Sequence, residues 1–192
     1  MTVSTASSAW PAGPPDHLLD LAEWEALPED TSARFELVEG VMVVSPRPSY
    51  RHQDLVHRLC GQLRDQLPED LTALPEIDLV VDDGAGRGPA TVRVPDIVVV
   101  PSTHVADHAR GGRGEVVAAI EVVSPGSRRT DRVAKLAEYA EAGIPHYVVV
   151  DPDGPISEYV LTDTGGSGGY RPIDTWTGSA RLAFGPRISL SP

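Results

Sequence analysis

Two carboxylates stand in the middle of apolar runs that have the length and composition of buried β-strands. Asp96 lies within VRVPDIVVV, and Glu121 lies within EVVAAIEVV. A charged carboxylate left unpaired in such surroundings costs several kcal/mol, so each should meet a cation, a metal or strong hydrogen-bond donors. Two such acids on adjacent strands could share one divalent cation if they face the same side. Oxygen ligands of this kind suit Mg²⁺ or Mn²⁺ better than zinc.

Lys135 is the amine that could complete such a site. It lies on a helix predicted over residues 130–141, about a quarter-turn from the centre of an apolar stripe formed by Leu136, Tyr139 and Ala140. From that position its side chain could bend over the sheet edge toward the carboxylates, with its stem packed on apolar surface. It could equally point into water, which is the commoner fate of a helical lysine. The spacing leaves both arrangements open.

A structural ion-pair network is the competing explanation for the two buried acids. Arg93, Arg128 or Arg132 could neutralise them without any metal. Pro95 favours a functional site instead, because it cannot donate to a strand ladder and so predicts an irregular strand at Asp96. Irregular strands often expose a side chain at a site.

The elements that must position these residues follow from the hydrophobic periodicity. It predicts helices over residues 18–26, 50–67 and 130–141, a β-hairpin over 34–45, strands over 77–82, 92–100, 115–123 and 146–151, an edge strand over 156–161, and one or two short strands after it. The nearly continuous apolar runs are typical of central strands covered on both faces. This order predicts an α/β or α+β fold with a mixed central β-sheet flanked by helices and an N-terminal β-hairpin.

Length and composition favour one domain with a flexible tail. The 192 residues suffice for a substantial core, which we expect over residues 17–192. Residues 1–16 are rich in Ser, Ala, Pro and Gly, which predicts a flexible tail, and they show no secretory signal. No apolar run approaches the ~18 residues of a membrane span. The one cysteine, Cys60, permits no internal disulfide, so a cytoplasmic location is expected.

The net charge of −12 argues against a protein that coats nucleic acid non-specifically, because phosphate contacts dominate such binding. It does not exclude a nuclease, since a local basic rim and bound divalent cations can offset the global field. Such a rim is available around the starts of two predicted helices, at Arg47, Arg51, Arg58, Arg64, Arg128, Arg129 and Arg132.

Several stretches of the chain together resemble the PD-(D/E)xK nuclease superfamily, and within it the bacterial Uma-two-type restriction endonuclease family. They are RFELVEGVMVVSP, SYRHQDLVHRL, VPDIVVV, AAIEVVSPGSRRTDRVAKLAEYAEAGIPHYVVVD and ISEYVL. The stretch over residues 118–151 is the most specific of them. The resemblance implies a restriction-endonuclease-like core of helix, three strands, helix and strand, with the active site at one end of the sheet.

The resemblance also implies roles for individual residues. Asp96 matches the superfamily's Pro-Asp aspartate, and Glu121 matches the acid of its (D/E)xK element. Val123 stands where the superfamily's lysine usually lies, and Lys135 from the following helix looks like the family's substitute for it.

Glu36 and His52 match further family positions near the site. Glu36 could assist with the metal, and His52 could contact phosphate. A histidine packed at a helix end is an equally good interpretation of His52.

The implied function is a Mg²⁺- or Mn²⁺-dependent endonuclease that hydrolyses phosphodiester bonds of DNA. In it, Asp96 and Glu121 would bind the metal, and Lys135 would position the water or stabilise the developing negative charge. A homodimer is one arrangement that would cut both strands. The alternative is a catalytically silent scaffold or partner-binding protein with the same fold, which the acidic composition and Val123 favour.

Overall fold

A computed structural model describes residues 15–28, 33–45, 48–107, 114–124, 126–127, 129–162 and 169–191. Most of the predicted tail lies outside these ranges, as do Arg47 and Arg128 of the predicted basic rim. The chain divides into two compact units, one formed by residues 1–47 and 82–93 and the other by residues 48–81 and 94–192. The flexible tail and the single domain over residues 17–192 stay predictions.

The first unit contains the predicted β-hairpin. Its strands β1 (Arg34–Val38) and β2 (Val41–Ser45) pair antiparallel, and β1 also pairs with β5 (Thr91–Arg93). The hairpin turn has positive φ at Glu39 (49°) and Gly40 (78°), which is typical of tight two-residue hairpin turns. A side chain at residue 40 would also collide with Leu18, because a Cβ there would lie 2.8 Å from the Leu18 Cβ. Helix α1 (Leu21–Glu25) and a 3₁₀ turn, η1 (Gly84–Gly86), complete this unit.

The second unit is built on a six-stranded sheet with the order β10-β9-β8-β7-β6-β3. These strands are β3 (Leu71–Pro75), β6 (Ile97–Pro101), β7 (Ala118–Val122), β8 (His146–Val150), β9 (Pro155–Leu161) and β10 (Tyr170–Thr177). β7 and β8 pair parallel, and the other neighbours pair antiparallel. The sheet is therefore mixed, which confirms the predicted fold class.

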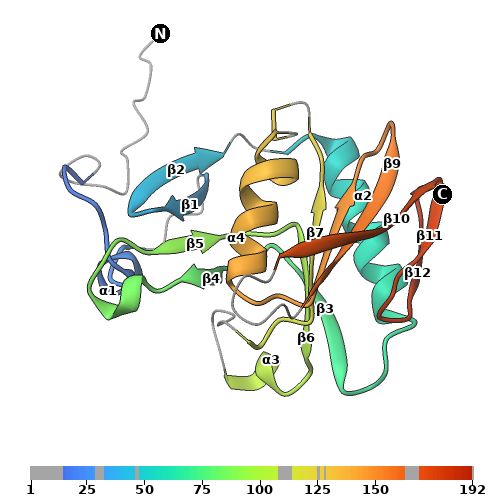
Figure 1. Cartoon of the computed structure of the whole chain (residues 1–192), viewed down its shortest axis with the longest axis horizontal. Helices are drawn as coiled ribbons and strands as arrows, with labels where there is room; N and C mark the ends of the chain where they lie inside the picture. Colours follow the sequence, from blue (N-terminus) through green and yellow to red (C-terminus); the bar gives the residue numbers. More distant parts are fainter. Residues whose placement is uncertain are drawn as a thin grey trace, which may run out of the picture. The chain divides into compact units, whose positions relative to one another are not determined.

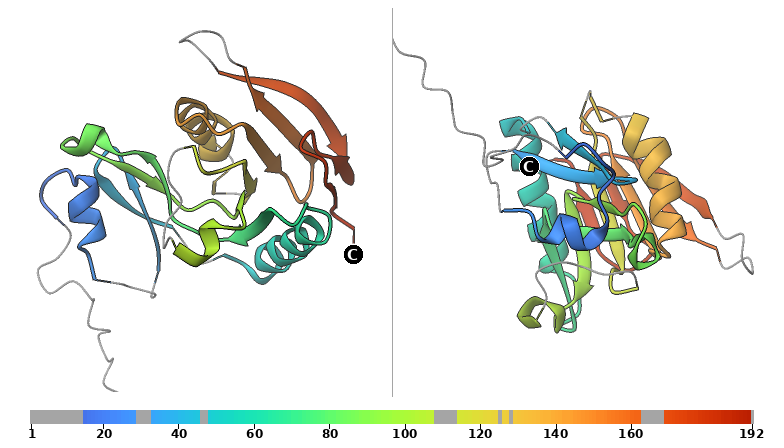
Figure 2. Two further views of the ribbon diagram at one scale, coloured as in Figure 1. Left: turned by 90° about the horizontal axis from the view of Figure 1, so that it is seen from below. Right: turned by 90° about the vertical axis from the view of Figure 1, so that its left-hand side faces the viewer.

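Helices cover both faces of this sheet (Figures 1 and 2). On one face, α2 (Tyr50–Arg64) packs Leu59 and Leu63 against alternate strand residues such as Ile97 and Ile120. On the other face, α4 (Lys135–Glu141) packs Tyr139 against the intervening residues, among them Val98 and Ala119. The two-residue period of the strands thus sorts their side chains into two separate apolar clusters.

Four further elements belong to the second unit or reach its boundary. They are β4 (Leu79–Asp82), α3 (His104–Asp107) and the two-stranded pair of β11 (Ser179–Arg181) and β12 (Arg187–Ser189). Ala180 and Ile188 of this pair join the apolar cluster under α2. In the described part of the chain, no helix is long and apolar enough to cross a membrane.

Two predicted strands differ from the observed ones, and one observed strand was not predicted. The single strand predicted over 92–100 is wrong: β5 and β6 are separate strands in different units, because the segment around Pro95 leaves the ladder. The prediction of 156–161 as an edge strand is also wrong, since the long β10 pairs with β9 and takes the edge. β3 was not predicted, because its five residues lie between turn-forming segments and show no clear period.

Truncation of the α2 core should destabilise the second unit. We expect Leu59→Ala to lower the free energy of unfolding by about 2–5 kcal/mol, because Leu59 is fully buried and its removal leaves a cavity. Urea unfolding followed by circular dichroism measures this loss. Val133→Ala is the matched control, since Val133 is 61% exposed and should change stability by less than about 0.5 kcal/mol. Equal stability losses in the two variants would contradict the assigned core.

Candidate active site

The pairing of β6 with β7 brings Asp96 and Glu121 together. In the antiparallel register, Ile97 lies opposite Ile120 and Val98 lies opposite Ala119. Continuing this register by one residue sets Asp96 opposite Glu121, and directly opposed residues share one face of a sheet. Both side chains are buried, at 3% and 2% exposure. Glu121 therefore points to the face that α4 covers, and Asp96 lies next to it at the start of β6.

Asp96 is held by a strand and by a helix start. Its Oδ2 accepts a hydrogen bond from the backbone N–H of Val122 at 2.7 Å. Its Oδ1 lies 3.2 Å from Nε2 of His52, in the first turn of α2. The side chain of Ser49 caps that helix by accepting from the His52 N–H. These contacts fix the orientation of the carboxylate before any ligand binds.

Glu121 receives two donors from the helical segment above it. Lys135 donates from Nζ to Oε1 at 2.8 Å, and the Tyr139 hydroxyl donates to the same oxygen at 2.9 Å. Lys135 is itself buried, at 4% exposure. Of the two arrangements that the sequence left open for this lysine, the structure shows the one that points toward the carboxylates.

A π-helical turn, η2 (Thr130–Ala134), lies directly before Lys135. The Lys135 backbone N–H donates to the carbonyl of Thr130, five residues earlier, so this turn is wider than an α-helical one. The buried face of the segment is then formed by Asp131, Lys135 and Tyr139 at spacings of four residues. The predicted stripe was wrong in part, because Leu136 and Ala140 are only half-buried.

Lys135 is the one lysine among sixteen basic residues of the chain, and the other fifteen are arginines. The protein thus uses arginine for its other basic positions and an ammonium at this buried one. The two groups are not equivalent, because an ammonium is a compact point charge and a guanidinium is a broad planar fork.

Burial dominates the electrostatics of the site. It raises the pKa of Glu121 to about 7, although the nearby Lys135 ammonium lowers it, and the charges of Asp96 and Asp131 add to the rise. The cluster thus carries more carboxylates than ammonium groups. A positive ion bound next to Glu121 would favour its charged form.

Glu36 lies in the first unit, where its Oε2 accepts from Arg93 Nη1 at 3.0 Å in a buried ion pair. Arg132, another predicted partner for the two acids, donates to Asp151 at 3.3 Å. A role for Glu36 in the active site stays a prediction.

Tyr139 and Asp131 are not among the site residues predicted from the sequence. Asp131 is 1% exposed, and its Oδ1 lies 3.6 Å from Lys135 Nζ. The signal that could have found them is their spacing of four residues on either side of Lys135, which places all three on one side of a helical segment.

The two strand acids are the residues that could hold a metal. No group of three or more His, Cys, Asp or Glu side chains within the described ranges is arranged to hold an ion. Mg²⁺ is commonly bound through one or two carboxylates and keeps several water ligands. The donor set formed by Asp96 and Glu121 fits this kind of binding.

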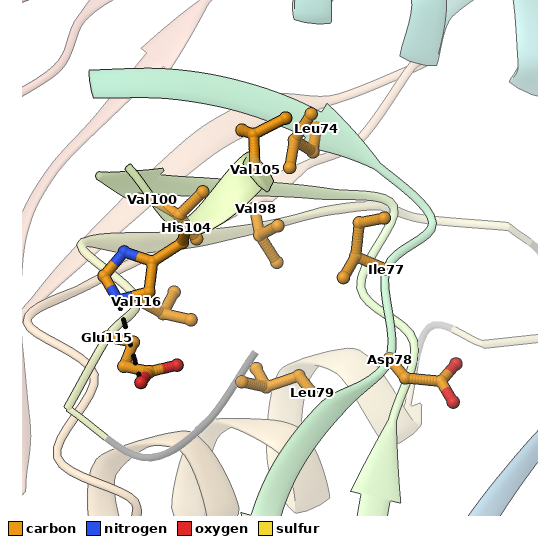
Figure 3. Close-up of a pocket in the computed structure, with 10 residues that line it drawn as sticks. All are labelled: Leu74, Ile77, Asp78, Leu79, Val98, Val100, His104, Val105, Glu115 and Val116. Atoms are coloured by element: carbon orange, nitrogen blue, oxygen red, sulfur yellow. Dashed lines mark ion pairs between the residues drawn. The ribbon is translucent and has the colours of Figure 1, made fainter. Parts of the chain in front are cut away.

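An apolar cavity of about 210 Å³ lies elsewhere in the second unit (Figure 3). Its walls include Leu74, Val98 and Val116, and at its rim His104 lies 3.7 Å from Glu115. None of the predicted site residues lines it. Its apolar walls do not suit a phosphate substrate.

Comparisons with known proteins agree with this fold. A model of the Uma2 family, described as "Putative restriction endonuclease", matches residues 21–191. The chain is also similar to a solved structure from Anabaena variabilis ATCC 29413, described as "a putative nuclease belonging to DUF820". The two chains share 20% sequence identity with a TM-score of 0.65, over 90% of this chain and 95% of that one. The predicted restriction-endonuclease-like fold is confirmed. No protein with a curated description matches the chain.

The raised pKa of Glu121 should make stability fall as pH rises. The folded protein retains the Glu121 proton up to about pH 7, whereas the unfolded chain releases it near pH 4.5. The stabilisation by the Glu121 proton is fully present below the pKa of Glu121 in the unfolded chain. It is lost as the pH rises from that value through the pKa of Glu121 in the folded protein. We expect the free energy of unfolding of the wild type to fall across this window by on the order of 1–3 kcal/mol more than that of Glu121→Gln. Urea unfolding at several pH values measures the difference, and parallel profiles would contradict it.

Proposed function

Because the chain belongs to the Uma2 family, we propose that it is an endonuclease that hydrolyses phosphodiester bonds of DNA with Mg²⁺ or Mn²⁺ as cofactor. The observation that carries the proposal is the convergence of Asp96, Glu121 and Lys135 in one buried cluster, with Lys135 Nζ 2.8 Å from Glu121 Oε1. The fold that the chain shares with a protein described as a putative nuclease supports the proposal.

Asp96 and Glu121 would hold the cation. Both donors to Glu121 bond Oε1, so Glu121 would use Oε2 as its metal ligand. The Val122 N–H fixes one oxygen of Asp96, and His52 lies next to the other. A divalent ion bound there supplies activation of a water molecule and stabilisation of charge on the scissile phosphate.

Lys135 would act on the negative charge that develops on the phosphate. Its ammonium is preorganised, since its stem is buried and its charge is already directed at the metal-binding carboxylate. Preorganised charges in a partly dry site stabilise a transition state more than mobile charges in water do. Tyr139 orients the same carboxylate oxygen and leaves Lys135 to provide the positive charge.

DNA would approach the arginines near the starts of α2 and of the π-turn, where Arg51 pairs with the exposed Asp153 and Arg132 pairs with Asp151. Arg51 at the start of α2 and Arg129 before the π-turn are both exposed, and Arg132 is half-buried. Such residues could contact phosphates and offset the net charge of −12 near the site. A homodimer would provide one active site for each DNA strand. A cytoplasmic location would give the protein access to chromosomal or plasmid DNA.

Cleavage of supercoiled plasmid tests the proposal directly. We expect the wild type to nick plasmid with Mn²⁺ or Mg²⁺ and to lose this activity with EDTA. Lys135→Met should reduce the rate about 100-fold or more while Mn²⁺ still binds, because it removes only the stabilising charge. Asp96→Asn should lose both cleavage and Mn²⁺ binding in calorimetry. Asp174→Asn is the matched control, since this exposed aspartate lies on β10.

The same experiments separate the alternatives. Equal cleavage by the wild type and Asp96→Asn would assign the activity to a contaminant. Absence of Mn²⁺ binding at millimolar concentration would favour the catalytically silent scaffold. A structural ion-pair network would instead show itself as loss of folding in Asp96→Asn.

A further inference from the structure

Asp131 is a buried carboxylate that the proposed chemistry does not use. Its Oδ1 lies 3.6 Å from Lys135 Nζ, and the same ammonium lies 2.8 Å from Glu121 Oε1. Lys135 is therefore placed between two carboxylates, one on β7 and one on its own helical segment. All three side chains are nearly inaccessible to solvent.

The main chain of Asp131 is fixed on both sides. Its N–H donates to the Ser127 carbonyl at 2.9 Å, and its own carbonyl accepts from the Tyr147 hydroxyl at 2.6 Å. Burial raises the pKa of Tyr147 well above its usual range, so this hydroxyl stays protonated as a donor. The Tyr147 ring also meets the Tyr139 ring edge-on, with centroids 5.2 Å apart. These contacts fix the backbone of Asp131 relative to the sheet.

The π-helical turn supports a functional role for this arrangement. Turns of this type are rare and occur frequently at functional sites. Here the turn includes Asp131 and ends immediately before Lys135, whose backbone N–H closes it. It keeps both charged side chains on the buried side of the segment.

The charge of the cluster also points to a cation. Asp96, Glu121 and Asp131 are three buried carboxylates, whereas Lys135 is one ammonium. A divalent cation would bring these four groups close to neutrality, which lowers the cost of burying them.

We propose that Asp131 is a positioning residue that holds the Lys135 ammonium in the site when a divalent cation engages Glu121. This inference rests on the proposed metal-dependent function. A carboxylate that binds a divalent ion attracts an ammonium less strongly, and the two positive charges repel each other. Asp131 is then the carboxylate that keeps Lys135 next to the scissile phosphate.

Because Lys135 is the one lysine of the chain, its ammonium can be observed by itself. Protein labelled with ¹⁵N-lysine gives a single side-chain ammonium signal in NMR, visible only where exchange with water is slow. We expect this signal in the wild type with and without saturating Mg²⁺. In Asp131→Asn it should persist without Mg²⁺, because Glu121 still pairs with Lys135, and should broaden beyond detection with Mg²⁺. Glu141→Gln, which changes an exposed acid of the same helix, should behave as the wild type does.

Calorimetry on the same samples separates the two proposals. If Mg²⁺ binds and the signal of Asp131→Asn stays protected, the role of Asp131 is overturned and the metal site stands. If Mg²⁺ does not bind the wild type, the proposed function fails and this inference fails with it. With plasmid substrate, kcat of Asp131→Asn should fall roughly 10- to 100-fold with KM unchanged, because the ammonium is misplaced while substrate binding is retained.

If Asp131→Asn does not fold, the proposal can be tested on the wild-type protein by crystallography. A crystal structure of the wild type soaked with Mn²⁺ should show Lys135 Nζ within hydrogen-bond distance of Asp131. A Lys135 side chain turned away from Asp131 in that structure would overturn the proposal.

Discussion

The burial of two adjacent carboxylates at one end of a β-sheet is the constraint on which the arrangement of this protein depends. Glu121 lies on β7 and Asp96 directly precedes β6, two strands whose other side chains build the apolar core, so the charges of both acids must be compensated locally. The compensation comes from both sides of the pair. A strand N–H and the start of α2 serve Asp96, whereas the helical segment over the opposite face serves Glu121.

This requirement explains irregularities that would otherwise weaken the fold. The chain interrupts strand structure around Pro95, between β5 and β6, and Asp96 lies directly before the first paired residue of β6. The helical segment departs from α geometry in the turn before Lys135, and its buried face carries Asp131 and Lys135 beside Tyr139. Local conflicts with ideal geometry are expected at functional sites, where a stable scaffold compensates for them.

The turn signals and the nearly continuous apolar runs were sufficient to predict the hairpin, the central strands β7 and β8, and a mixed sheet. The carboxylates could be found because a charged residue within an apolar strand is conspicuous without any structure. The orientation of Lys135 could not be predicted, because a lysine at the flank of an apolar stripe can point to the sheet or to water. Leu136 was expected nearer the centre of the buried face than Lys135, because the apolar pattern marks Leu136 and gives no weight to a charged residue that has a buried partner. The edge position of β10 was missed because its exposed residues show no apolar alternation.

In the proposed function, an amine from the helix stands in for one from the strand at Val123. Val123 follows Glu121 by two residues, so both side chains point to the face that α4 covers, and Val123 packs into the apolar cluster there. In the superfamily pattern that this chain resembles, a lysine at that position would reach along the strand toward the acids. Here the covering helix supplies Lys135 to the same face, and its ammonium meets Glu121 from above. The exchange conserves the location of the positive charge while the strand position becomes part of the core. The position of the Lys135 ammonium then depends on how the helical segment packs on the sheet. The π-turn and the hydrogen bond from Tyr147 to the Asp131 carbonyl contribute to that packing.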